Sequence, residues 1–190
     1  MKESVINLEE LPKELKDVVQ FHGHLCPGLV IGYRAAILAR KKLGLGRSED
    51  EELVAIVEND SCAVDAIQYI NGATFGKGNL VFQDHGLHAY TFIERTSGKQ
   101  IRIELKADIF DDSAEPRQKS RQEIINKMLQ IADDELFTVK KVNIEVPEKA
   151  HIFNSVKCSK CGLMVMETRA RVLNQKMYCI PCWESELNKN

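Results

Sequence analysis

The sequence carries almost no net charge and contains no long apolar run. Its 26 Lys and Arg residues nearly balance 28 Asp and Glu residues, giving a formal net charge of −2 at pH 7. A nucleic-acid partner, which would need a strongly basic surface, is therefore not expected. No apolar run approaches the roughly 18 residues of a membrane-spanning helix, and the opening MKESVINLEELPKELKD lacks the apolar segment of a signal peptide. We therefore expect a cytoplasmic protein with no membrane partner.

Cysteine is the residue type that stands out against this background. The chain has 6 cysteines among 190 residues. Because thiols stay mostly reduced in the cytoplasm, these cysteines indicate metal or thiol chemistry before disulfides. The length and a hydrophobic content of 44% suffice for one domain with its own core and a small additional segment.

Helical and strand patterns are mixed along the first 150 residues rather than strictly alternating. Helices are expected over 12–19, 27–43, Cys62 to Gly72, and 116–133. Strands are expected at ELVAIVEN, NLVFQD, LHAYTFIER, KQIRIELK and TVKKVNIEVP, with hairpin turns at HG and SGK. This mixture predicts an α+β fold, with a mixed helix and antiparallel-sheet core over 1–150, a linker over 151–157 and a small zinc-binding segment over 158–190.

The C-terminal segment has a cysteine spacing typical of a zinc site. CSKC and CIPC form a C-x2-C-x17-C-x2-C pattern whose candidate ligands are Cys158, Cys161, Cys179 and Cys182. ETRARV and QKMYC predict a hairpin between the pairs, and WESELNKN a helix after them, an order that resembles a treble clef. So short a segment cannot bury enough apolar surface to fold alone, so we expect a structural zinc ion. Two redox-active thiol pairs are the alternative.

The stretch FHGHLCPG places two histidines and a cysteine before an apolar helix. Pro27 suits the first position of that helix and favours extended backbone at Cys26, which then becomes the N-cap residue. A thiol at a helix N-terminus has a lowered pKa and more thiolate character. If the residues before Pro27 are extended, side chains two positions apart point the same way, so His22, His24 and Cys26 would share one face.

A second cysteine occupies an equivalent place in VENDSCAVDAIQ. A buried strand is expected to end near Asn59 and a helix to begin near Cys62, with Asp60 and Asp65 on either side of that cysteine. Both cysteines of the core would then stand at helix N-termini, where ligands often gather. Imidazole, thiol and carboxylate groups in one cleft are donors for zinc or another transition metal. Packing and helix capping are the alternatives for each residue taken singly.

The strings FHGHLCPGLVIGYRAA and DSCAVDAIQYINGATFGKGNL, with the terminal C-x2-C pairs, resemble the FmdE family of formylmethanofuran dehydrogenase subunits over nearly the whole chain. The resemblance implies an α+β core, an auxiliary treble-clef zinc finger and a homodimer. It implies one-carbon metabolism in a molybdenum or tungsten enzyme complex. It also implies a pocket whose His and Cys residues correspond here to His22, His24, Cys26 and Cys62, with Asp60, Asp65 and Gln68 matching the second string.

Three functions remain open from the sequence, which favours the first. The first is a metal-binding accessory protein or small metalloenzyme whose core holds zinc or iron through Cys26, Cys62 and one or both histidines. Asp60 or Asp65 would orient a ligand or move a proton. The second is thiolate chemistry without a metal, with Cys26 as nucleophile and His24 as its base. The third is a non-catalytic module that binds a small molecule or docks onto a larger redox enzyme complex.

Overall fold

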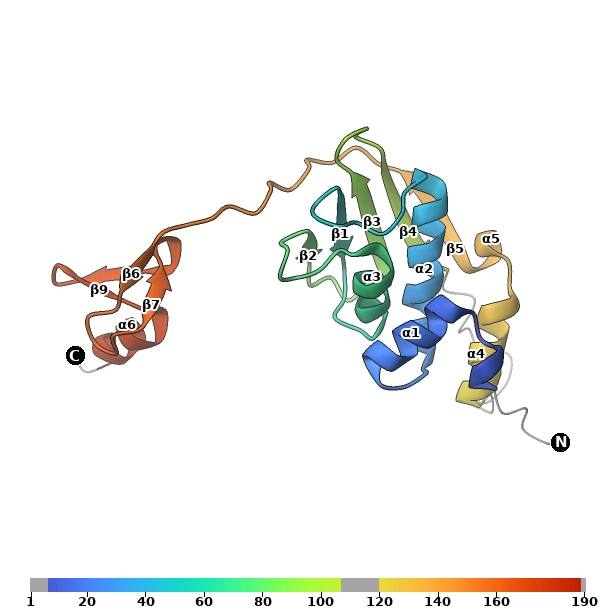
Figure 1. Cartoon of the computed structure of the whole chain (residues 1–190), viewed down its shortest axis with the longest axis horizontal. Coiled ribbons are helices and arrows are strands. Elements are labelled where there is room, and N and C mark those ends of the chain that lie inside the picture. The colour runs from blue at the N-terminus through green and yellow to red at the C-terminus, as the bar shows by residue number, and fades with distance from the viewer. Residues whose placement is uncertain (1–6, 107–119, 189–190) are drawn as a thin grey trace. The chain divides into compact units, whose positions relative to one another are not determined.

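The computed structural model describes residues 7–106 and 120–188. The chain divides into two compact units, with the boundary between Lys149 and Ala150. The first unit is a sheet with helices, and the second consists of short hairpins and a helix (Figure 1). Within the described ranges, no helix combines the length and the apolar character needed to cross a membrane.

A five-stranded sheet with the order β2-β1-β3-β4-β5 is the frame of the first unit. Its strands are β1 (Leu53–Val57), β2 (Leu80–Phe82), β3 (Ala89–Glu94), β4 (Gln100–Leu105) and β5 (Phe137–Lys141). β1 is parallel to β2, and the other neighbouring pairs are antiparallel. This mixed sheet, with helices packed against it, confirms the expected α+β fold.

Strands β2 and β3 follow each other in the chain but do not pair. A hairpin turn was expected at HG, whereas the two strands lie on opposite sides of β1. The expectation is wrong because turn residues do not determine which strands pair, and β1 already fills the position beside β3. Since β1 and β2 are parallel, their C-terminal ends lie at the same edge of the sheet.

Helices cover one face of this sheet (Figure 1). They are η1 (Leu8–Glu10), α1 (Lys13–His22), α2 (Pro27–Leu43), α3 (Ala63–Asn71), α4 (Arg121–Gln130) and α5 (Asp133–Leu136). The long apolar run of α2 is buried over more than one face, as the sequence predicts. Its residues pack with alternate sheet residues such as Ile101 and Ile103 in one core.

The helix expected over 116–133 and the strand expected over 138–147 both end before the expected residue. The helix expected over 116–133 ends at Gln130, and residues 116–119 lie outside the described ranges. Ser120 and Glu123 form the capping box that begins α4. The strand expected over 138–147 ends at Lys141, because Gln100 then binds both backbone groups of Ile144 through its side-chain amide. Hydrogen bonds with the Gln100 side chain thus replace strand pairing at Ile144.

Helices α2 and α3 approach each other so closely that only glycine fits between them. A Cβ atom added to Gly32 would lie 2.1 Å from the carbonyl oxygen of Ala63, which is backbone and cannot swing aside. One turn earlier, a Cβ atom on Gly28 would lie 3.3 Å from Cβ of Cys62. The two glycines therefore place the N-terminal ends of both helices side by side.

The TFGKGN stretch between α3 and β2 is fixed by two side chains. Lys77 donates through Nζ to the backbone carbonyls of Ser48, Glu49 and Asp50, at 3.2, 3.2 and 2.9 Å. Asn79 is fully buried, and its amide group accepts from the backbone N–H of Thr74 and donates to backbone carbonyls on both sides of the crossover. This stretch therefore has a structural role in joining α3 to β2.

The second unit is made of two hairpins and one helix. Its elements are β6 (Ser155–Lys157), β7 (Met164–Met166), η3 (Glu167–Arg169), β8 (Arg171–Leu173), β9 (Lys176–Tyr178) and α6 (Ile180–Leu187). β6 pairs with β7 and β8 with β9. The β8–β9 hairpin lies where the sequence predicts it. The helix begins at Ile180, three residues before the expected WESELNKN stretch, and β6 falls within the residues expected to form a linker.

The close approach of α2 and α3 leads to a stability prediction. We expect Gly32→Ala to lower the free energy of unfolding by about 2–4 kcal/mol, because the added methyl group must push two backbones apart. Gly46→Ala is the matched control, since no atom lies within 4 Å of the added Cβ and its φ is not positive. Urea unfolding of both variants measures the difference, and equal losses of stability would contradict this account of the packing.

Candidate functional site

His22, His24 and Cys26 come together at the turn between α1 and α2. One nitrogen of each histidine and the Sγ atom of Cys26 all lie within 4.8 Å of one another. The route to this arrangement differs from the expected extended strand, because His22 is the last residue of α1. Gly23 caps that helix with φ of 100°, a left-handed conformation that favours glycine. A helix end and a turn, rather than strand alternation, bring the side chains together.

Cys26 is the N-cap residue of α2, as the following proline predicts. Its backbone is extended, with φ −145° and ψ 163°, and its Sγ accepts a hydrogen bond from the N–H of Leu29 at 3.4 Å. The residue is only 7% exposed. The start of a buried helix, with its free N–H groups and the positive end of its dipole, therefore faces this sulfur.

A carboxylate orients the histidine nearest to this sulfur. His22 Nδ1 lies 2.7 Å from Oδ2 of Asp65 in α3, so this nitrogen carries a hydrogen and donates a hydrogen bond to the carboxylate. His22 Nε2 is then the basic nitrogen, and it lies 4.0 Å from Sγ of Cys26. Gln68 donates to the other oxygen of Asp65, at 3.4 Å. Carboxylate–histidine pairs of this kind are typical of metal sites and of catalytic triads.

Cys62 is adjacent to this group but does not belong to the mutually close ligand atoms. It is the N-cap residue of α3 without a side-chain capping bond. Burial raises the pKa of its thiol, and the neighbouring Cys26 thiol raises it further. Asp60, which was expected beside the site, is exposed and also outside the close group. Of the six residues that the sequence singles out in the core, the structure thus gathers three ligand atoms and one orienting carboxylate.

A pocket of about 320 Å³ opens beside these residues. Its polar side is formed by His22, Asn59, Asp60, Ser61, Cys62 and Asp65, and its apolar side by Val57, Val64, Leu80 and Phe82. No lysine or arginine is among these lining residues. Sequence reasoning missed the wall formed by Leu80 and Phe82, and the signal that could have found it is the parallel β1–α3–β2 crossover, which brings the end of β2 to the site.

The four C-terminal cysteines also come together. Their sulfur atoms all lie within 4.8 Å of one another, and those of Cys161 and Cys179 are 3.8 Å apart. Tetrahedral zinc with Zn–S bonds of about 2.3 Å separates its sulfur ligands by about 3.8 Å. Cys158 and Cys161 lie in the β6–β7 turn, Cys179 caps α6, and Cys182 lies in the first turn of that helix.

The protonation chemistry of this cluster suits a divalent cation. Backbone N–H groups, that of Cys161 foremost, lower the pKa of the Cys158 thiol to about 6. The adjacent Cys179 sulfur raises the pKa of the Cys182 thiol to about 12. The protein alone therefore favours one thiolate and opposes a second beside it, and a zinc ion would allow all four to ionise.

Comparison with known proteins places these features in a family. Residues 21–138 match the family model described as "FmdE, Molybdenum formylmethanofuran dehydrogenase operon", and residues 151–185 match the prokaryotic dksA/traR C4-type zinc finger. A probable S-adenosyl-L-methionine-binding protein from Archaeoglobus fulgidus is 30% identical over 188 residues, covering 85% of this chain and 51% of that protein. The chain thus spans about half the length of this curated relative.

A solved structure extends the likeness to both units. It is that of a tungsten formylmethanofuran dehydrogenase FmdE-like protein from Syntrophus aciditrophicus, with a TM-score of 0.69 and 25% sequence identity. The match covers 97% of this chain and 96% of that one. The C4-type match and the four close sulfurs support a structural zinc in the C-terminal unit. The chain belongs to the FmdE family, and its C-terminal unit is a C4-type zinc finger.

Proposed function

We propose that the core binds one transition-metal ion, zinc or iron, through His22, His24 and Cys26, and that the protein is a metal-binding accessory protein or small metalloprotein. The observation that carries this proposal is the mutual approach of the three ligand atoms within 4.8 Å. Three protein ligands suit a site that keeps a further position for a ligand or water. The FmdE relationship supports this function at the level of the family.

The surrounding residues have separate roles in this proposal. Asp65 holds the His22 ring so that its basic nitrogen faces Cys26. Asp60 lines the pocket, where its exposed carboxylate can accept a proton from a bound molecule and return it. Cys62 supplies a protonated thiol beside Cys26. The metal, when bound, would supply Lewis acidity at its open position.

Thiolate chemistry without a metal is the second candidate. The Cys26 sulfur accepts a hydrogen bond from the N–H of Leu29 at the start of α2, and Asp65 orients its neighbouring imidazole. His22 rather than His24 makes the 4.0 Å contact with the sulfur, so His22 is the base in this alternative. Rapid alkylation of Cys26 in protein that contains no core metal would favour it.

The pocket beside the site fits a small ligand that combines positive charge with an apolar part. Its lining includes the carboxylates of Asp60 and Asp65 and the apolar side chains of Leu80 and Phe82, and no lysine or arginine from the described ranges. Its volume of about 320 Å³ is within the range of small-molecule sites. We infer S-adenosyl-L-methionine, named in the description of the Archaeoglobus relative, as a candidate ligand because its sulfonium is cationic.

The zinc finger is proposed as a docking element. Its Leu163, Met164 and Val172 side chains are 68, 63 and 64% exposed. Exposed apolar side chains on so small a unit support a role in contacting another protein. We propose a homodimer, and docking onto a larger redox enzyme complex, since the Syntrophus protein is described as similar to part of a dehydrogenase. A cytoplasmic role in one-carbon metabolism is part of the same proposal.

Metal content should separate the two sites. We expect Cys26→Ser to lose about one metal equivalent per chain and to keep the finger zinc, and Cys161→Ser to lose only the finger zinc and to unfold the C-terminal unit. Cys62→Ser is the matched control and should keep both ions. Elemental mass spectrometry of tag-free protein, with limited proteolysis of the finger, measures these outcomes. Unchanged metal content in Cys26→Ser would overturn the core site.

The carboxylate that orients His22 should tune metal affinity. We expect Asp65→Asn to weaken core-metal binding by about 10- to 100-fold, because the histidine loses its anionic partner. Asp60→Asn should change that affinity by less than about threefold, since Asp60 lies outside the close ligand group. Competition with a chelating dye measures both values. An equal effect of the two substitutions would contradict the assigned role of Asp65.

Ligand charge should decide binding in the pocket. We expect S-adenosyl-L-methionine to bind more tightly than its neutral analogue S-adenosylhomocysteine, and Asp60→Asn to weaken this binding by about fivefold, as expected for one exposed charge. Asp84→Asn, outside the pocket lining, is the control. Isothermal titration calorimetry measures the four affinities, those of both compounds for the unaltered chain and that of S-adenosyl-L-methionine for each variant. Equal binding of the charged and neutral compounds would exclude charge recognition.

A further inference from the structure

Three lysines from separate elements surround a second hollow at one end of the sheet. Lys42 lies in the last turn of α2, Lys99 just before β4, and Lys141 at the end of β5. The hollow has a volume of about 480 Å³, and its other lining residues are Leu43, Gly98, Gln100, Ile101, Val142 and Asn143. None of the residues that line the core metal site borders it.

The positive charge of this hollow is not neutralised. Among residues 7–106 and 120–188, no aspartate or glutamate lines it. Within residues 7–106 and 120–188, none of the three lysine side chains makes an ion pair or a hydrogen bond. Lys140, the neighbour of Lys141, differs in this respect, because its Nζ binds Oε2 of Glu104 at 2.7 Å. Lysine side chains that border one concave surface without an anionic partner attract anions.

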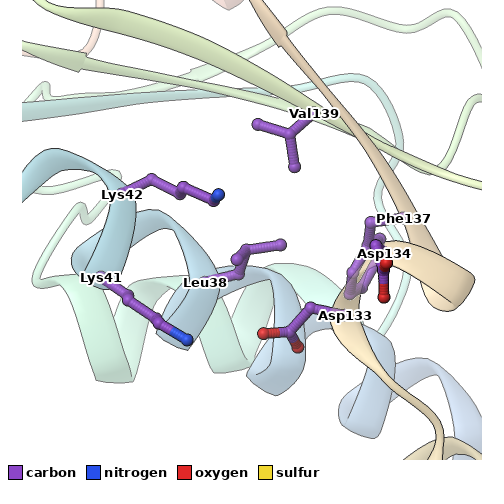
Figure 2. A pocket seen from close by; sticks show the side chains of 7 residues that line it. All are labelled: Leu38, Lys41, Lys42, Asp133, Asp134, Phe137 and Val139. Carbon is purple, nitrogen blue, oxygen red and sulfur yellow. The ribbon is translucent and has the colours of Figure 1, made fainter.

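Lys42 also lines an adjoining hollow of about 470 Å³, whose charged residues can be compared with those of the first (Figure 2). Lys41 and Lys42 extend from α2, and Asp133 and Asp134 lie across from them, near Phe137. This neighbouring space therefore has charges of both signs. In the part of the chain that the structure describes, the charged residues that line the hollow shared by Lys42, Lys99 and Lys141 are all lysines.

The helix dipole and the protection of edge strands explain the positions of two of these lysines taken singly. They do not explain why all three line one hollow. Cations at a helix C-terminus interact favourably with its dipole, which accounts for Lys42. A lysine on an edge strand prevents pairing with other chains, which accounts for Lys141. Neither reason applies to Lys99 in the β3–β4 turn. The floor between them is apolar, with Leu43 only 6% and Ile101 only 7% exposed, and it could contact a ligand's carbon skeleton.

We propose that this hollow binds a small organic polyanion such as a nucleoside polyphosphate. The anionic groups would lie among Lys42, Lys99 and Lys141, and the uncharged part would rest on Leu43 and Ile101. Asn143, whose side-chain amide has no hydrogen-bond partner within the described ranges, can donate to the ligand. The site is independent of the proposed core metal.

Two probes test the proposal on the full, metal-loaded chain. ATP and inorganic tripolyphosphate share the anionic chemistry, and only ATP has a base and sugar for the apolar floor. We expect both to bind, with affinity falling as salt is raised, and the Lys99→Gln and Lys141→Gln double variant to weaken both by about tenfold. Lys140→Gln, on the same strand but paired with Glu104, is the matched control and should bind as the unaltered chain does.

The outcomes separate the site from other sources of phosphate binding. Tighter binding of ATP than of tripolyphosphate supports an organic ligand, and equal binding supports a polyphosphate held by the lysines alone. If Cys26→Ser abolishes binding and the lysine variant does not, the phosphates bind the core metal and the proposal is overturned. No binding of either probe, or equal losses in Lys140→Gln and the double variant, also overturns it.

Discussion

The close contact between α2 and α3 is the constraint on which the site depends. Because Gly32 lets the backbone of Ala63 approach, the two helices lie side by side, and Gly28 brings Cys62 next to the first turn of α2. The N-terminal ends of both helices, with Cys26 and Cys62, then meet at one edge of the core. A small residue at one packing position thus determines where the thiols lie, and the imidazole–carboxylate pair is assembled around them.

The parts of the fold that the sequence predicts are those encoded over a few residues. Pro27 and the apolar run after it predict the buried helix and its cysteine cap, and Ser120 with Glu123 predicts the start of α4. The placement of β2 could not be predicted in the same way. Whether β2 pairs with β1 or with β3 depends on the α3 crossover and on which edge of β1 is free. The residues of the turn at Gly86 determine neither of these.

The residues of the candidate site also fall into two groups, those that the sequence predicts from local patterns and those that come together only in the fold. The four finger cysteines and the His–Cys group are close in sequence or regularly spaced, so ligand chemistry alone identifies them. The pairing of His22 with Asp65 spans 43 residues and requires α1 to end beside α3, and the wall at Phe82 requires the parallel strand pair. The sequence also suggested that residues 22–26 are extended, whereas helix α1 continues to His22 and the left-handed Gly23 makes the turn.

The position of His22 as the last residue of α1 couples two equilibria in the proposed site. Helix ends fray, and this end is fixed by the carboxylate of Asp65 and, when bound, by the metal. Binding of the ion would therefore stabilise the last turn of α1, and an ordered last turn would in return strengthen binding of the ion. Occupancy of the proposed core site would therefore change how firmly the last turn of α1 packs against α3.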